Sequence, residues 1–189
     1  MKTLFSRLAT AAVGVALLAV GASGQGSNDS ELTGRLKKLF PNAATFSAKS
    51  GNPAHYKAFG PGAAGAKEGE LLGYAYWTTD IEPLERGFDG PIKMLVGLNR
   101  EGEITGVIVT DHREPYGYFS VDLPDWPKQF EDKSIRDSFK VGADVDAISR
   151  ATITVTSASR AIRNASRKVA RAHLAPPPSP AAPAATPAQ

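Results

Sequence analysis

The stretch Asp146–Ser157, which reads DAISRATITVTS, comes directly before the longest helical pattern in the chain. It begins with an acidic residue, continues with small side chains, and then places a hydroxyl group at every second position: Thr152, Thr154 and Thr156. Two interpretations stay open. The intervening Ile153 and Val155 favour a strand or an extended turn. Alternatively, hydroxyls just ahead of a helix can hold a phosphate, because the helix dipole and free amides there favour negative charge.

The pattern that follows predicts an amphipathic helix capped by Thr156 or Ser157. Its apolar positions recur at spacings of four and three residues, which places them on one narrow face: Ala158, Ile162, Ala165, Val169 and Ala172. Basic residues cover the other sides: Arg160, Arg163, Arg167, Lys168 and Arg171. Because the apolar side chains are mostly small, we expect this helix to lie close against a sheet.

The rest of the chain predicts a single α+β domain with a largely antiparallel sheet flanked by helices. Alternating apolar residues and turn signals indicate a short strand pair and three longer strands, the last two forming a hairpin: 44–59, 70–79, 92–98 and 103–110. A first helix is expected from a cap at Ser30 to Pro41, with Leu32, Leu36, Leu39 and Phe40 on one face. A short helix is expected at 126–130.

Three segments are expected along the chain: a signal peptide at 1–24, the domain at 29–174, and a disordered Pro/Ala-rich tail at 175–189. Lys2 and Arg7 ahead of a short apolar run indicate export through a secretory signal peptide. Removing these two charges changes the balance from 22 − 19 = +3 to 20 − 19 = +1, which excludes an electrostatic case for nucleic-acid binding. The absence of cysteine excludes disulfides, iron–sulfur clusters and a cysteinyl flavin.

The loop after the third long strand contains a second group of polar residues, which includes His112, Glu114 and Tyr116. These can be a cofactor-binding group, or solvated charges and a turn cap. A His–Glu acid/base pair lacks an accompanying nucleophile motif. A metal site has weak support, because the other histidines, His55 and His173, lie far away in sequence and show no ligand spacing.

Several separated motifs together resemble the periplasmic FMN-binding domain family over about Leu36–Ala172. They are Leu39–Ala43, Gly73–Tyr76 followed by Thr78–Asp80, Leu95–Leu98, Ile104–Val107, His112-x-Glu114-Pro115, and Asp146-x-x-Ser149-x-Ala151-Thr152. The set is most similar to the N-terminal flavin domain of NosR-type proteins. The FMN-bearing subunits of Rnf complexes and of the sodium-pumping NADH:quinone reductase are more distant relatives. Arg150 stands where the family has glycine.

The resemblance implies that FMN is joined to Thr152 through a phosphoester bond. A flavin transferase that depends on FAD and magnesium would make this bond and release AMP. The residues expected around the cofactor are Asp146, Ser149, Arg150, Ala151, His112, Glu114 and Tyr116. Asp146 can hold a metal ion during the transfer. Arg150 can pair with the flavin phosphate or resist the backbone shape of a glycine.

The implied function is that of an electron carrier rather than an enzyme. It would pass electrons between a membrane quinol-side donor and a periplasmic acceptor such as a cytochrome, with nitrous oxide respiration as one setting. The alternatives are a reversible or non-redox FMN-binding module that assists metalloenzyme maturation, and an exported structural domain without a cofactor.

Overall fold

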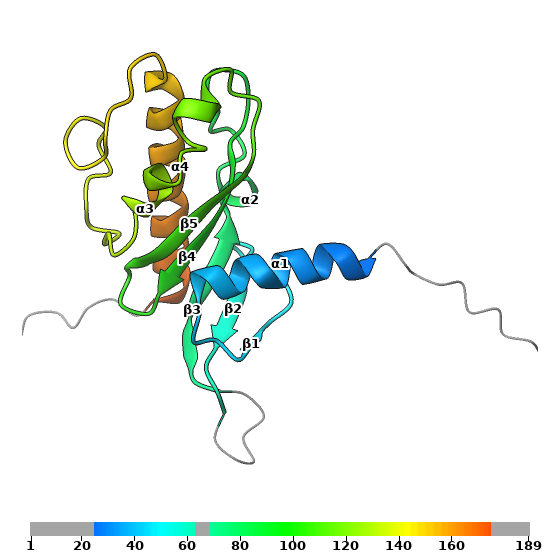
Figure 1. Cartoon of the computed structure of the whole chain (residues 1–189). Coiled ribbons are helices and arrows are strands. Elements are labelled where there is room, and N and C mark those ends of the chain that lie inside the picture. Colours follow the sequence, from blue (N-terminus) through cyan, green and yellow to red (C-terminus); the bar gives the residue numbers. More distant parts are fainter. Residues whose placement is uncertain (1–24, 63–68, 175–189) are drawn as a thin grey trace, which may run out of the picture.

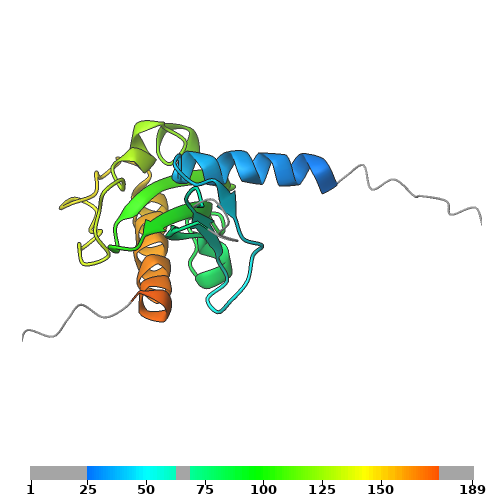
Figure 2. The ribbon, with the colours of Figure 1, turned by 90° about the horizontal axis from the view of Figure 1, so that it is seen from below.

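The computed structural model describes residues 25–62 and 69–174 (Figure 1). The predicted signal peptide at 1–24 and the predicted tail at 175–189 lie outside the described residues. Within them, the chain forms one five-stranded antiparallel sheet with a long helix on each face, as Figure 2 shows from below. The predicted α+β class is therefore confirmed. None of the described helices is both long enough and apolar enough to cross a membrane.

The sheet has the simple order β1-β2-β3-β4-β5, and each strand pairs antiparallel with the next. The strands are β1 (Thr45–Phe46), β2 (Tyr56–Phe59), β3 (Leu71–Trp77), β4 (Lys93–Asn99) and β5 (Ile104–Asp111). The predicted short pair and the predicted hairpin are both confirmed. In the centre of the sheet Val96 lies opposite Tyr76 on one side and Val107 on the other.

Alternation along the strands divides the core between the two faces of the sheet. Tyr74 and Tyr76 of β3 belong to the larger apolar cluster, which lies against the C-terminal helix. Ala75 and Trp77 belong to the smaller cluster, which lies against the N-terminal helix. Both faces are covered, so all four side chains are buried. Successive residues point to opposite faces of the sheet, but buried and exposed residues do not alternate.

The N-terminal helix α1 (Gln25–Leu39) packs its last turns against the smaller cluster through Leu36, Leu39 and the following Phe40. The helix begins before Ser30, so Ser30 lies inside the helix and the prediction that it forms the N-cap is wrong. Close packing requires small residues on the sheet. A Cβ atom at Gly97 would lie 3.2 Å from the Cβ atom of Leu39 and 2.2 Å from Thr105 Oγ1.

The C-terminal helix α4 (Thr152–His173) covers the opposite face with small and branched side chains. Ala158, Ile162, Ala165 and Val169 are buried as predicted. Ala172 is exposed and Ala170 is buried instead, so the buried stripe departs from the predicted one at the last turn of the helix. Tyr76 anchors the helix, since its hydroxyl donates to Ser166 Oγ at 2.7 Å.

Three short helices occupy the connections: α2 (Thr78–Ile81), η1 (Gly117–Phe119) and α3 (Asp125–Lys128). The predicted strand 70–79 ends at Trp77 instead. Thr78 holds the turn that follows: its Oγ1 accepts a hydrogen bond from the amide of Met94 at 3.2 Å and donates one to the carbonyl of Ile92 at 3.3 Å. The short helix predicted at 126–130 is present as α3.

Candidate functional site

The hydroxyl stretch forms the first turns of α4, so the predicted strand at Ile153 and Val155 and the predicted cap at Thr156 or Ser157 are wrong. Thr152 is the first helical residue and Ala151 is the N-cap. The reason is tertiary packing. Thr154 and Val155 are neighbours in sequence and both are buried. A helix allows this while it leaves Thr152 exposed.

The start of α4 offers unpaired backbone donors beside the exposed Thr152. The amide of Val155 bonds to the carbonyl of Ala151 at 3.0 Å. The amides of the three preceding residues therefore have no carbonyl to bond within the helix, and Ala151 brings no capping oxygen. An anion attached to Thr152 would meet these amides and the positive end of a 22-residue helix.

A pocket of about 250 Å³ opens at this helix start. It is lined by Phe88, Tyr116, Arg150, Ala151, Thr152, Ile153 and Thr154. Four of these residues were predicted to surround the cofactor: Tyr116, Arg150, Ala151 and Thr152. The structure thus brings one residue of the His112 loop to the predicted attachment residue.

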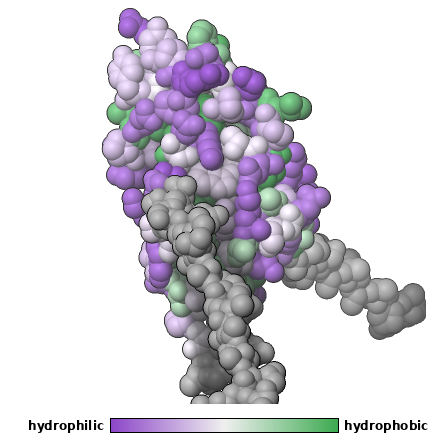
Figure 3. Space-filling model, turned by 90° about the vertical axis from the view of Figure 1, so that its right-hand side faces the viewer, coloured by the Kyte–Doolittle hydropathy of each residue, from purple (hydrophilic) through white to green (hydrophobic). Residues whose placement is uncertain are grey.

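The rim of this pocket is apolar and exposed. Phe88, Tyr116 and Ile153 are exposed to 67%, 44% and 58%. Hydrophobic side chains reach the surface at the upper end of the molecule in Figure 3, the end at which α4 begins in Figure 1. Large apolar side chains grouped around a polar group are typical of a binding site rather than of ordinary surface.

Glu114 joins three segments of the site: its own loop, the loop of Phe88 and the start of α4. Its side chain is buried and accepts the amides of Phe88 at 2.9 Å and Asp89 at 3.0 Å. It also accepts the hydroxyl of Thr154. A Cβ atom at Gly87 would lie 2.4 Å from Glu114 Oε1, so a glycine is needed for the loop to approach the carboxyl group. Glu114 therefore positions Phe88 and the start of α4.

His112 in turn fixes the backbone of Glu114. The amide of Glu114 donates to Nδ1 of His112 at 3.1 Å, so Nε2 carries the ring proton and donates to Asp122 Oδ1 at 2.8 Å. Gly117 packs tightly on the same ring, where a Cβ atom would lie 2.1 Å from Cε1. Both ring nitrogens are thus engaged in holding the loop. Direct contact between His112 and a cofactor stays a prediction.

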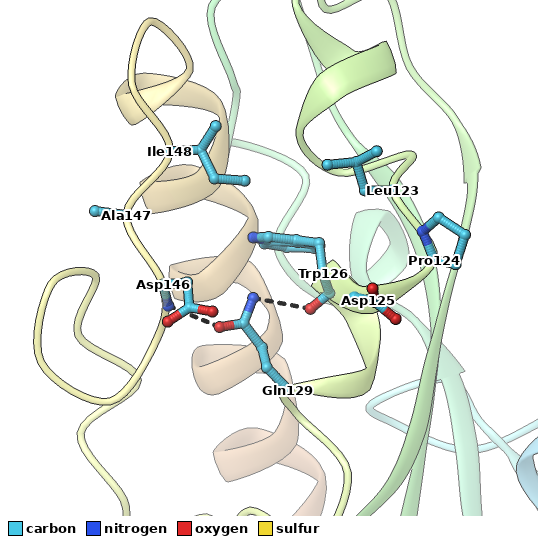
Figure 4. A pocket seen from close by; sticks show the side chains of 8 residues that line it. All are labelled: Leu123, Pro124, Asp125, Trp126, Gln129, Asp146, Ala147 and Ile148. Carbon is cyan, nitrogen blue, oxygen red and sulfur yellow. Dashed lines mark hydrogen bonds between the residues drawn. The ribbon is translucent and has the colours of Figure 1, made fainter.

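Asp146 lies in a second pocket, which Figure 4 shows from close by. This pocket has a volume of about 430 Å³ and is lined by Leu123, Pro124, Asp125, Trp126, Gln129, Asp146, Ala147 and Ile148. Gln129 bridges it, accepting the amide of Asp146 at 2.7 Å and donating to the carbonyl of Trp126 at 2.9 Å. Asp146 and Thr152 therefore line different pockets. Ser149 is exposed in the loop between them.

Arg150 has φ = +68°, a backbone conformation that suits glycine far better than arginine. This residue precedes the N-cap of α4, so the left-handed turn sets the direction in which the helix begins. Arg150 adopts the shape that a glycine would have adopted, and its exposed guanidinium group lies at the rim of the pocket with Thr152.

The sequence alone did not indicate the role of Phe88. The residue stands in a loop between strands and carries no motif. Contacts distant in sequence bring this loop to α4: the amides of Phe88 and Asp89 bond to Glu114, and Glu85 accepts hydrogen bonds from Ser157 and Arg160. An exposed phenylalanine beside Asp89-Gly90 was the available signal, but it also fits an ordinary turn.

The predicted resemblance to FMN-binding domains and to Rnf proteins is confirmed by comparison with known proteins. Residues 87–167 match the FMN-binding domain family. An ion-translocating oxidoreductase complex subunit from Haemophilus influenzae (strain PittEE) is 33% identical over 114 residues, which cover 55% of this chain and 51% of the relative. The subunit of the same name from Vibrio vulnificus (strain YJ016) is 32% identical over 88 residues, which cover 41% and 42%. The chain spans about half the length of these curated relatives, or less.

Proposed function

We propose that this chain, whose residues 87–167 match the FMN-binding domain family, is a periplasmic electron-transfer flavoprotein with FMN joined to Thr152 Oγ1 through a phosphoester bond. The observation that carries the proposal is the position of Thr152. Its hydroxyl is exposed, stands at the first residue of α4, and lines a pocket with apolar walls. A phosphate there gains the free amides of the helix start, and the pocket beside it can take a flat ring.

The attachment is a phosphoryl transfer without a change of oxidation state. The Thr152 oxygen would bond to the phosphorus of the FMN half of FAD, the bond from this phosphorus to the AMP oxygen would break, and AMP would leave. The hydroxyl proton would pass to solvent or to a base of the transferase, which also supplies magnesium. This chain contributes the exposed acceptor hydroxyl and the guanidinium group of Arg150, which can pair with the phosphate.

The apolar rim is suited to hold the ring system. Bound FMN can accept and give one or two electrons. Phe88, Tyr116 and Ile153 would cover the ring faces and exclude part of the water, while their exposure leaves the ring edge open to a partner. The proposal therefore describes a carrier that exchanges electrons at its surface and catalyses no reaction of its own.

The sequence and the relatives support the proposed compartment and partners. The apolar run after Lys2 and Arg7 supports export, and the relatives are named as components of an ion-translocating oxidoreductase complex. We therefore expect a flavin transferase as the modifying enzyme and a membrane redox complex or a cytochrome as the electron-transfer partner. The proposed role in nitrous oxide respiration rests on the similarity to NosR-type proteins alone.

The intact mass of the denatured protein tests the attachment. The full chain is co-expressed with a flavin transferase, and the expected mass increase is that of one FMN less one water. Thr152→Ala should lose the increase and Thr152→Ser should keep it. Thr156→Ala is the matched control, because Thr156 lies one helical turn further on in the same helix and should not affect the increase.

Covalent flavin retained by Thr152→Ala would overturn the assignment. An unmodified wild-type chain that still binds FMN before denaturation would favour the reversible accessory module, and an unmodified chain without bound flavin would favour a structural domain.

A further inference from the structure

Two histidines from distant parts of the chain face each other at the opposite end of α4 from Thr152. His55 stands directly before β2, and His173 is the last residue of α4. Their ring centres are 4.3 Å apart and the planes are inclined by 55°. Tyr74 of β3 packs against both rings, with ring centres 5.1 Å from each.

The Nε2 atoms of both histidines are buried and have no hydrogen-bond partner among the described residues. The side chain of His55 is the clearer case. It is 2% exposed, and its Nδ1 lies 2.8 Å from the carbonyl oxygen of Pro53. A carbonyl oxygen can accept a hydrogen bond but cannot donate one, so Nδ1 carries the proton and Nε2 presents a bare lone pair.

The surroundings hold His55 in this orientation. A Cβ atom at Gly51 would lie 2.6 Å from Cε1 of His55, which shows how closely the loop backbone packs on the ring. An imidazole whose Nδ1–H donates to a backbone carbonyl while Nε2 stays free has the arrangement that metal-binding histidines usually show. An unpaired buried nitrogen is otherwise unfavourable, because it loses its hydrogen bonds to water without replacement.

We propose that His55 and His173 form a two-histidine site for a divalent transition-metal ion, with Cu²⁺ bound more tightly than Ni²⁺ or Zn²⁺. Imidazole nitrogens suit these ions, and the order of affinity follows the general trend for nitrogen ligands. Two imidazoles that bind one ion through Nε2 at ~2.0–2.1 Å have ring centres roughly 4.5–5.2 Å apart. The separation of 4.3 Å in this structure would therefore widen slightly on binding.

Water completes the coordination in this proposal. No group of three or more His, Cys, Asp and Glu side chains in the described ranges 25–62 and 69–174 is placed to hold a metal ion. A pocket of about 370 Å³ lies beside His173 and is lined also by Leu71, Tyr74, Arg100, Glu101 and Leu174. In the proposed site the ion and its waters would enter from this pocket. Binding would tie the end of α4 to the start of β2, and so would stabilise the folded chain.

The chain has three histidines, which provides a matched control. Untagged full-length protein without flavin is titrated calorimetrically with Cu²⁺ and, separately, with Zn²⁺. We expect one saturable site, with Cu²⁺ the tighter ion and a metal-dependent rise in Tm. His55→Gln and His173→Gln should each weaken binding about tenfold or more and remove the rise in Tm. His112→Gln should keep both, since both of its ring nitrogens are engaged in the loop.

Electron paramagnetic resonance of the Cu²⁺ form gives a second readout. The wild-type spectrum should show nitrogen couplings from two imidazoles, and the spectrum of His173→Gln should show at most one. The proposal is overturned if the wild-type chain binds no metal saturably, if both single variants bind as the wild type does, or if the loss of His112 alone abolishes binding.

Discussion

The hydroxyl of Thr154, in the first turn of α4, donates a hydrogen bond to the buried carboxyl group of Glu114, in the loop after β5. The same carboxyl group accepts the amides of Phe88 and Asp89. Three segments that are distant in sequence therefore meet at one side chain. Its position behind the pocket means that Glu114 fixes the walls of the pocket without having to touch what binds in it.

Glu114→Ala should reduce the free energy of unfolding by roughly 2–4 kcal/mol, because it leaves two amides and a hydroxyl without their buried acceptor. Thr154→Val removes one of the three bonds and should cost about 1 kcal/mol. Glu70→Gln is the control, since its exposed ion pair with Arg100 should contribute less than ~1 kcal/mol. Urea denaturation measures all three. Equal stabilities of Glu114→Ala and the control would contradict this role.

Arg150→Gly should increase the free energy of unfolding by about 1 kcal/mol, because φ = +68° costs an arginine more than a glycine. Arg150→Ala is the informative control. It removes the same guanidinium group but keeps a Cβ atom in the left-handed conformation, so it should show no gain. If both variants gain equally, charge rather than backbone strain explains the effect. Thermal unfolding of the three proteins distinguishes these outcomes.

The sheet could be predicted from the sequence because its signals are local. The turn Asn99–Gly102 and the apolar residues on either side predict the β4–β5 hairpin, and the structure has it. The hydroxyl stretch could not be assigned in this way. β-Branched residues favour strands, but the burial of Thr154 and Val155 against the rest of the molecule outweighs this propensity.

The candidate site was predicted as a set of motifs, and the structure divides that set. Tyr116 and Thr152 line one pocket and Asp146 lines another, although Asp146 and Thr152 belong to the same short motif. Spacing along a chain does not show on which side of a left-handed turn each side chain falls. The contact between His55 and His173 was missed for a related reason, since it joins the start of β2 to the end of α4.

Acid should destabilise the loop that leads into the Asp146 stretch through Asp144. Partial burial raises the pKa of the Asp144 carboxyl group, but hydrogen bonds from Ser138 and from the amides of Lys140 and Phe139 outweigh it and lower the pKa to about 2. The folded state therefore favours the carboxylate. This contribution to stability is fully present above the ordinary pKa of 3.8 and is lost as the pH falls from there to about 2.

Asp144→Asn should accordingly reduce the free energy of unfolding by roughly 1–2 kcal/mol at pH 6, after allowance for solvent screening. The difference from the wild type should shrink as the pH falls through this range. Glu101→Gln, a change in an exposed turn, should leave the profile unaltered. Denaturation curves at pH 6, 4 and 3 provide the measurement. A difference that is constant with pH would mean that packing, and not ionisation, accounts for the effect.

The two pockets on either side of the loop 146–151 give different positions for the flavin ring of the proposed carrier. A tether at Thr152 favours the pocket of Phe88, Tyr116 and Ile153, because Thr152 itself lines it. In the flavinylated protein, Tyr116→Ala should then increase the quenching of flavin fluorescence by iodide, since it removes an exposed wall of this pocket. Trp126→Phe, in the other pocket, should leave the quenching unchanged. The reverse result would place the ring beside Asp146, and the phosphate would then have to turn away from the amides at the start of α4.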